Sequence, residues 1–214
     1  MTALAVAVSG YIWAVARLVA HPKLSTRALV ICALAAVVWR VPLIFLPELP
    51  AHDAVRYVWD ARAHRAGVDP YQARPDDAAL EAIHSEVTRG VDAAWLPTIY
   101  LPVAQLYFRT VAAVDESIFA FRAAAVVCDV AIMLVLAMTL RAAQRPASGM
   151  LLYAWHPLVP LEGAMGAHMD FVGVLALLLA WLALLRGRRM VAALAFVAAV
   201  LVKPLPLVLA PLLW

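Results

Sequence analysis

The chain has 214 residues, a formal net charge of +3 at pH 7 and 66% hydrophobic residues. Because soluble domains are close to half apolar, this composition, with a mean hydropathy of +0.88, excludes an ordinary soluble domain and predicts an integral membrane protein. The two cysteines, Cys32 and Cys128, both lie inside apolar runs, so a disulfide framework is not expected.

Apolar stretches of membrane-spanning length predict an all-α fold, a polytopic bundle of transmembrane helices. The first stretch, 2–20, is followed by the polar turn HPKLSTR at 21–27 and by a second stretch, 28–47. Lys23 and Arg27 place this turn in the cytoplasm under the positive-inside rule, so the chain should emerge outside at residue 48. Later apolar stretches predict further spans at 117–140, 149–165, 171–185 and 190–214.

The connection at 48–100 differs from the rest of the chain in its charge. It has nine acidic and five basic residues, whereas the remainder has twelve basic and five acidic ones. The basic excess sits in short connections, as in cytoplasmic loops, and gives no reason to expect a nucleic-acid partner. We interpret 48–100 as a large extracytoplasmic loop, because it is too long to be a simple connector.

Two interfacial helices are expected in this loop. Asp53 is placed to start a helix that runs to Ala66, with Gly67 as its stop. A second helix is expected at 77–89. Both should be amphipathic and lie along the membrane surface. Helical spacing puts one polar set on a common face of the first helix: Asp53, Arg56, Tyr57, Asp60 and His64.

The segment 101–115 decides the topology. Basic runs at Arg141–Arg145 and Arg186–Arg189 are both expected inside, which requires 101–115 to be a re-entrant or in-plane helix. A spanning 101–115 would instead place Arg141–Arg145 outside, against the positive-inside rule. The charges therefore favour the re-entrant arrangement, and the spanning one stays open.

Ionisable residues inside apolar stretches are costly to bury in a membrane and mark candidate functional positions. In the favoured topology four of them approach the outer surface, where Asp53 also lies. Structural alternatives stand beside this interpretation: Arg122 and Asp129 share a helix face and could serve only partners inside the bundle, and Arg40 could extend to the interface. The full set is Arg40, Arg122, Asp129 and the four outer residues Glu162, His168, Asp170 and Lys203.

Other catalytic motifs are missing from the sequence. Its histidines have no zinc-type spacing, no Gly-rich phosphate loop occurs, and no serine stands in a nucleophile-elbow context. An outer carboxylate beside Arg, Tyr and a second carboxylate suits activation of a hydroxyl nucleophile, and a basic group suits a departing phosphate. With apolar walls for a lipid tail, these features predict group transfer from a lipid phosphate carrier to an acceptor alcohol outside the cytoplasm.

Four stretches carry a resemblance to a known family: DAVRYVWDARAHRAGVDPY at 53–71, LPTIYLPVAQLYF at 96–108, YAWHPLVPLEGAMGAHMD at 153–170 and LVKPLPLVLAPLLW at 201–214. In order and spacing they resemble the GT-C-type membrane glycosyltransferases, in the polyprenyl-phosphate-sugar-dependent, mannosyltransferase-like group. The resemblance implies a multi-pass protein of the inner (plasma) membrane whose active site faces the extracytoplasmic side. It also implies a polyprenyl-phosphate-linked, mannose-like hexose as donor and a glycan or lipid as acceptor.

The resemblance further assigns site residues. Asp53 corresponds to the family's catalytic base, at the start of the first large extracytoplasmic loop. Apart from the resemblance, Asp60, Glu162 and Arg122 are candidates for support of the site. Some members use a divalent cation, which Asp53 with Asp60 or Glu162 could help hold, but no metal-ligand set is legible in the sequence. The side chains that would line the donor phosphate and sugar are Arg56, Tyr57, Tyr100, His168, Asp170 and Lys203.

Two features depart from the family pattern. Ala61 stands where glycine usually follows Trp-Asp, and members normally continue with several further transmembrane helices beyond the position of Trp214. The alternative functions are a non-catalytic or truncated membrane subunit, or a transporter module. A transporter should show internal repeats and paired helix breaks, whereas this chain has one clear break, at Lys203-Pro204, and no repeat.

Overall fold

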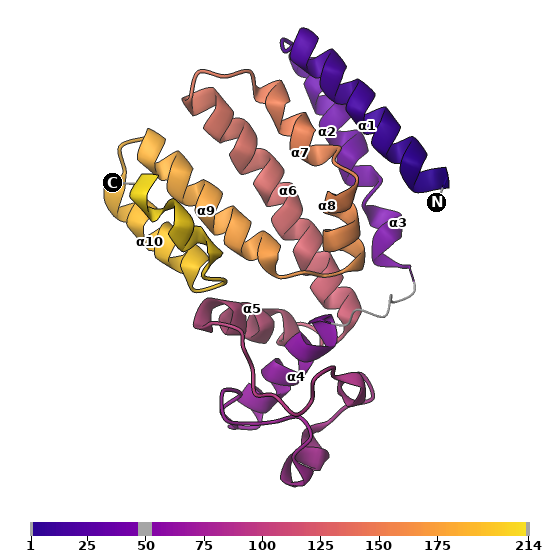
Figure 1. The fold of residues 1–214 in the computed structure, drawn as a ribbon, viewed down its shortest axis with the longest axis vertical. Coiled ribbons are helices and arrows are strands. Elements are labelled where there is room, and N and C mark those ends of the chain that lie inside the picture. Colours follow the sequence, from indigo (N-terminus) through magenta and orange to yellow (C-terminus); the bar gives the residue numbers. More distant parts are fainter. Residues whose placement is uncertain (1, 47–52, 213–214) are drawn as a thin grey trace.

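The computed structural model of the protein describes residues 2–46 and 53–212. Within these ranges every regular element is a helix and no strand occurs, which confirms the predicted all-α fold (Figure 1). The predicted loop start at 48 and the last two residues of the predicted span 190–214 lie outside the described residues. The longer helices are α1 (Thr2–Ala20), α2 (Thr26–Val38), α4 (Asp53–Arg65), α5 (Pro102–Ala112), α6 (Ile118–Ala142), α9 (Asp170–Leu185) and α10 (Arg189–Val200).

Several helices meet the length and composition of membrane spans. Thr26–Ile44, which comprises α2 and the short α3 (Val41–Ile44), and α6 are each long and apolar enough to cross. A third crossing is present if Leu158–Met165 and α9, which meet at a bend of 118°, form one broken span. α5 is not among these candidates, and Figure 1 shows it lying across the lower end of α6.

The predicted span 149–165 is interrupted near its middle. α7 (Met150–Ala154) ends before Trp155, and α8 (Leu158–Pro160) begins only after Pro157. A proline inside a helix removes a backbone hydrogen bond and crowds the preceding turn, so the helix breaks at this point. A π-helical turn, η4 (Leu161–Met165), follows directly and leads to the start of α9. Its position matters because η4 carries Glu162.

A polar unit made of α4, α5 and their connection lies below the apolar helices (Figure 1). α4 ends as the sequence predicts. Gly67 adopts a φ of 75°, its N–H bonds to the His64 carbonyl at 3.1 Å, and the Val68 N–H bonds to the Ala63 carbonyl at 2.9 Å. This Schellman arrangement satisfies carbonyls that have no partner within the helix.

The polar unit differs from two local predictions. α4 has no open polar face, because Tyr57 is only 1% exposed and Asp60 is fully buried. The expected helix at 77–89 is replaced by two short 3-10 helices, η1 (Ala78–Ile83) and η2 (Thr88–Gly90). The Thr88 hydroxyl accepts from the Ser85 N–H at 2.8 Å, and such side-chain bonds compete with a continuous α-helix.

A buried ion pair joins the junction of α2 and α3 to α6. Arg40 and Asp129 are both fully buried, with Arg40 Nε 2.5 Å from Asp129 Oδ2. The same guanidinium donates to the carbonyl of Ala154 at 3.0 Å, so the joint between α2 and α3 is held against α6 and α7. Arg40 therefore does not extend to the interface, and Asp129 serves a partner inside the bundle.

Candidate active site

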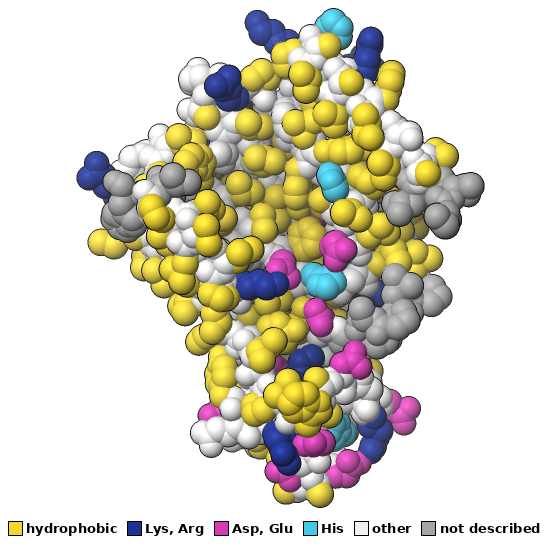
Figure 2. All heavy atoms as spheres, viewed as in Figure 1, with side chains coloured by type: hydrophobic (Ala, Val, Ile, Leu, Met, Phe, Trp, Pro, Cys, Tyr) yellow, Lys and Arg dark blue, Asp and Glu magenta, His cyan; other side chains and the backbone are white. Residues whose placement is uncertain are grey.

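Five ionisable side chains from three parts of the chain, α4, 162–170 and the break after α10, lie at the junction of the polar unit and the apolar helices. His168 Nδ1 lies 3.5 Å from Asp53 Oδ2, and its Nε2 lies 3.3 Å from Glu162 Oε2. Lys203 Nζ lies 2.6 Å from Asp170 Oδ1. Figure 2 shows acidic, basic and histidine side chains grouped in the middle of a largely hydrophobic face. We refer to these five residues as the charged cluster.

The charged cluster is open to its surroundings. The side chain of His168 is 29% exposed, and that of Asp53 is 53% exposed. Glu162, Asp170 and Lys203 are similarly accessible. Exposed ion pairs of this kind contribute little to folding stability, typically below about 1 kcal/mol. Folding stability therefore does not explain why these five side chains are arranged together. Because they are exposed, a ligand can reach them.

The backbone turn after η4 brings Glu162 and His168 together. The His168 N–H bonds to the Glu162 carbonyl at 3.1 Å, and Ala167 adopts a φ of 55°. A side chain on Gly166 would place its Cβ 2.5 Å from His168 Cδ2, so glycine is required for the imidazole to pack there. A left-handed conformation at alanine costs about 1–2 kcal/mol, and strain of this kind is concentrated at functional sites.

Lys203 is presented by the break after α10. Pro204 prevents the helix from continuing, and Lys203 lies at this point beside the first residue of α9, Asp170. The Val103 N–H, in the first turn of α5, bonds to the carbonyl of Leu201 at 3.1 Å. The helix break is thus fixed to the polar unit, and this contact brings the end of α10 to the charged cluster.

Tyr57 and Tyr100 support the cluster from below. Tyr57 stacks on Phe108 with ring centroids 4.3 Å apart, and its edge contact with Tyr100 is 5.3 Å. Its hydroxyl accepts from the Met169 N–H at 3.5 Å. Burial, together with the nearby Tyr100 and the Asp53 carboxylate, raises the pKa of Tyr57 well above its ordinary value. Burial also raises the pKa of Tyr100, and the charge of Asp53 adds to this, so both phenols stay neutral.

Arg56 and Asp60 lie apart from the charged cluster. Asp60 is buried and accepts hydrogen bonds from Arg56 Nε at 3.0 Å, Thr98 Oγ1 at 2.5 Å and Gln105 Nε2 at 2.7 Å. Burial raises the pKa of Asp60, and these bonds only partly oppose that effect. Arg56 also donates to the Leu96 carbonyl at 2.9 Å. The two residues lock α4 to the 96–98 segment and α5, and so act within the polar unit.

Thr98 and Gln105 are site-supporting residues that sequence reasoning missed. Gln105 interrupts an apolar run in α5, and this polar interruption is the signal that could have identified it. Thr98 has no comparable signal, since a threonine in a loop is common. Both residues became identifiable only through their shared partner, Asp60.

A divalent cation does not fit the residues as they are arranged. Over residues 2–46 and 53–212, no group of three His, Cys, Asp or Glu side chains could hold a metal ion. Asp60 is enclosed by its own hydrogen-bond donors, and Asp53 and Glu162 lie on opposite nitrogens of His168. The chemistry of the site is therefore derived below from protein side chains.

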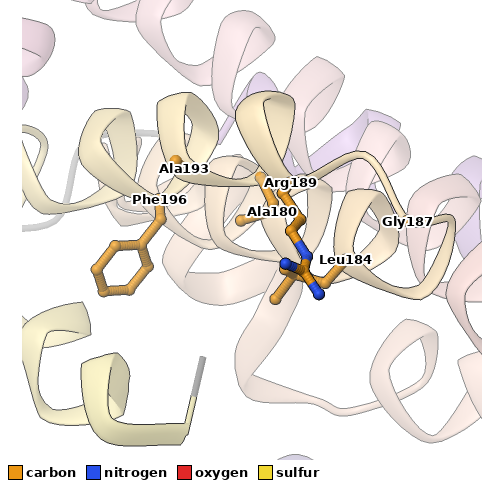
Figure 3. A pocket seen from close by; sticks show the side chains of 7 residues that line it. Ala180, Leu184, Gly187, Arg189, Ala193 and Phe196 are labelled. Carbon is orange, nitrogen blue, oxygen red and sulfur yellow. The ribbon is translucent and has the colours of Figure 1, made fainter. Parts of the chain in front are cut away.

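Two cavities elsewhere in the molecule contain none of these residues. One, of about 450 Å³, lies between α9 and α10 and is lined by Arg189 and Phe196 among small side chains (Figure 3). The other, of about 770 Å³, lies along α1, α2 and α7 and has mainly apolar walls, including Trp13 and Trp155. No carboxylate is among the described residues that line either cavity.

The comparisons with known proteins place the whole chain in one family. Residues 1–214 match a family described as alpha-(1->6)-mannopyranosyltransferase, N-terminal domain. Neither the curated proteins nor the solved structures contain a match. The family description and the geometry of the charged cluster are therefore the two grounds for a functional assignment.

Proposed function

This chain belongs to the family described as alpha-(1->6)-mannopyranosyltransferase, N-terminal domain. From this premise we propose the reaction that it carries out. The proposed reaction is the transfer of a mannose-like hexose from a polyprenyl-phosphate donor to an acceptor hydroxyl of a glycan or lipid. The enzyme would be of the GT-C type, embedded in the plasma membrane by several helices, with its site on the extracytoplasmic side.

One observation carries this proposal. The charged cluster combines an accessible carboxylate, Asp53, with an accessible cation, Lys203, and the surface above it is largely hydrophobic (Figure 2). A polyprenyl-phosphate sugar has the same combination of properties, because it joins a long apolar tail to a charged phosphate and a polar sugar. The hydrophobic surface suits the tail, and the cluster suits the head.

Asp53 is proposed as the general base. Its carboxylate accepts the proton of the acceptor hydroxyl while the acceptor oxygen forms a bond to the anomeric carbon of the sugar. The bond between that carbon and the phosphate oxygen breaks, and its electron pair leaves with the polyprenyl phosphate. This is a direct displacement, in which charge develops on the departing phosphate and must be stabilised.

Lys203 and His168 are proposed to stabilise the phosphate. Lys203 is paired with Asp170 at 2.6 Å and remains about half exposed, so a phosphate can contact the same ammonium group. The contacts that Arg56 makes with Asp60 and Leu96 leave it a positioning role in this proposal. Tyr57, which is buried, holds the segment that carries His168 through Met169.

The test is a transfer assay with protein reconstituted in vesicles. Labelled polyprenyl-phosphate mannose and a nucleotide-activated mannose are offered in parallel, with glycan and lipid acceptors. We expect transfer from the lipid-linked donor, and its loss in Asp53→Asn. Asp92→Asn, an exposed carboxylate in the same polar unit, is the matched control and should remain active. Full activity of Asp53→Asn would overturn the base assignment, and transfer from the nucleotide sugar alone would overturn the donor assignment.

A further inference from the structure

Arg122 is a buried arginine whose guanidinium is surrounded by main-chain carbonyls. It lies near the start of α6 and is 5% exposed. Its hydrogen bonds to the described residues go to backbone carbonyls: Nε to Met165 at 2.8 Å, and Nη1 to Ile44 at 3.2 Å and Leu46 at 2.5 Å. Among the described residues no carboxylate lies within ion-pair distance of it, unlike the other buried arginine, Arg40. Within residues 2–46 and 53–212, the groups that face this charge are main-chain carbonyls.

Both sets of carbonyls stand at helix ends. Ile44 is the last residue of α3, with Leu46 just beyond it, and Met165 is the last residue of η4. Carbonyls at a helix C-terminus lack partners within the helix and carry its partial negative charge. A guanidinium, with donors spread over a planar fork, can bond several of them at once. Arg122 thus joins two helix ends that have no direct sequence connection.

One of these helix ends leads directly to the charged cluster. Met165 is followed by the Gly166-Ala167 turn that presents His168, and the imidazole lies 3.5 Å from Asp53. The guanidinium of Arg122 therefore binds the chain three residues before the histidine that faces Asp53.

We propose that Arg122 is a positioning residue that holds His168 at its distance from Asp53. It does so by fixing the end of η4, which precedes the turn that carries His168, to α6 and to the end of α3. The proposal rests on the proposed function, because it takes Asp53 and His168 as residues that act in the transfer reaction. Arg122 itself does not touch the donor or the acceptor in this scheme.

The first measurement is independent of activity. In a variant with Cys32 and Cys128 replaced by alanine, Asp53→Cys and His168→Cys form a pair that a short bifunctional thiol reagent can cross-link. We expect ready cross-linking in the parent that keeps Arg122, and a rate about tenfold lower in Arg122→Gln, since the end of η4 that precedes residue 168 is no longer held on α6. Arg122→Lys, which keeps the charge but has a single donor centre, should be intermediate.

The second measurement separates positioning from donor binding. In the otherwise unmodified chain, Arg122→Gln and Arg122→Lys should lower kcat by about 10- to 100-fold, with KM for the donor unchanged. Arg141→Gln, at the exposed far end of α6, is the control and should change neither quantity. A raised KM with unchanged kcat would mean that Arg122 binds the donor, and would overturn the proposal.

The two measurements also distinguish this proposal from the proposed function. If the unmodified chain transfers no sugar, the proposed function fails, while the cross-linking rates still decide the role of Arg122. Equal cross-linking in Arg122→Gln and its parent would overturn the proposal. Loss of folded protein in both Arg122 variants would assign this residue to the fold as a whole, and would overturn it as well.

Discussion

The imidazole of His168 lies 3.5 Å from the carboxylate of Asp53, and this contact joins the polar unit to the apolar helical bundle. The other ring nitrogen faces Glu162 at 3.3 Å. Because each ring nitrogen faces a carboxylate, Glu162 can orient the imidazole, and the imidazole can in turn orient Asp53. The functional consequences of this arrangement can be measured at each residue.

Replacing His168 with phenylalanine should reduce transfer by about 10- to 100-fold, because it removes the proposed contact with the departing phosphate as well as the partner that orients Asp53. The phenyl ring keeps an aromatic side chain at this position, but it lacks the ring nitrogens, so both contacts with carboxylates are lost. Initial rates over a series of donor concentrations give kcat and KM in vesicles. His156→Phe is the control, since His156 packs edge-on against Tyr11, outside the charged cluster. An unchanged rate in His168→Phe would contradict a role for the imidazole.

Gly166→Ala should both destabilise the protein and reduce transfer. The new Cβ would lie 2.5 Å from His168 Cδ2 and 2.8 Å from the Glu162 carbonyl oxygen. The carbonyl cannot move without unwinding η4, so we expect a loss of about 1–3 kcal/mol in unfolding free energy. Thermal unfolding in detergent measures this loss. Gly90→Ala, where nothing lies within 4 Å of the added atom, should be close to neutral, and equal effects of the two changes would contradict the steric explanation.

The sequence predicted those features of the fold that have local causes. Apolar length identifies α6, the glycine signal locates the end of α4 at Gly67, and Pro204 marks the break that presents Lys203. Each depends on residues within a few positions of the feature itself. The interruption at Pro157 is equally local, but the apolar residues on both sides of it favour a single span at 149–165.

The sequence could not predict which polar side chains of α4 stay accessible. Helical spacing places Asp53 and Asp60 on one face, yet Asp60 is buried and Asp53 is about half exposed. The difference comes from Thr98 and Gln105, which reach Asp60 from distant parts of the chain. Periodicity gives the direction of a side chain and does not identify the segment that will cover it.

Asp60 should make stability depend on pH. Its pKa in the folded protein is raised from an ordinary value of 3.8, mainly by burial, so the folded state favours the protonated carboxyl. The stability that this provides is present below the ordinary value and is lost as pH rises through the folded pKa. Asp60→Asn cannot ionise, so its melting temperature relative to that of the unmodified protein should rise with pH from acid to neutral conditions. Asp92→Asn should show no such trend, and a constant difference for Asp60→Asn would contradict the assignment.

Removing one partner of the Arg40–Asp129 pair should lower the unfolding free energy strongly, whereas replacing both partners with apolar residues should lower it little. Arg40→Met leaves the Asp129 carboxylate buried without its partner, and we expect a loss of about 3–5 kcal/mol in unfolding free energy. The double variant Arg40→Met with Asp129→Leu removes both charges, so it should regain most of that stability in detergent unfolding experiments. Because neither residue lies in the charged cluster, the double variant should also retain transferase activity. Arg141→Met, at an exposed position of α6, controls for loss of a positive charge. A double variant as unstable as Arg40→Met would show that the pair is worth more than apolar packing at this position.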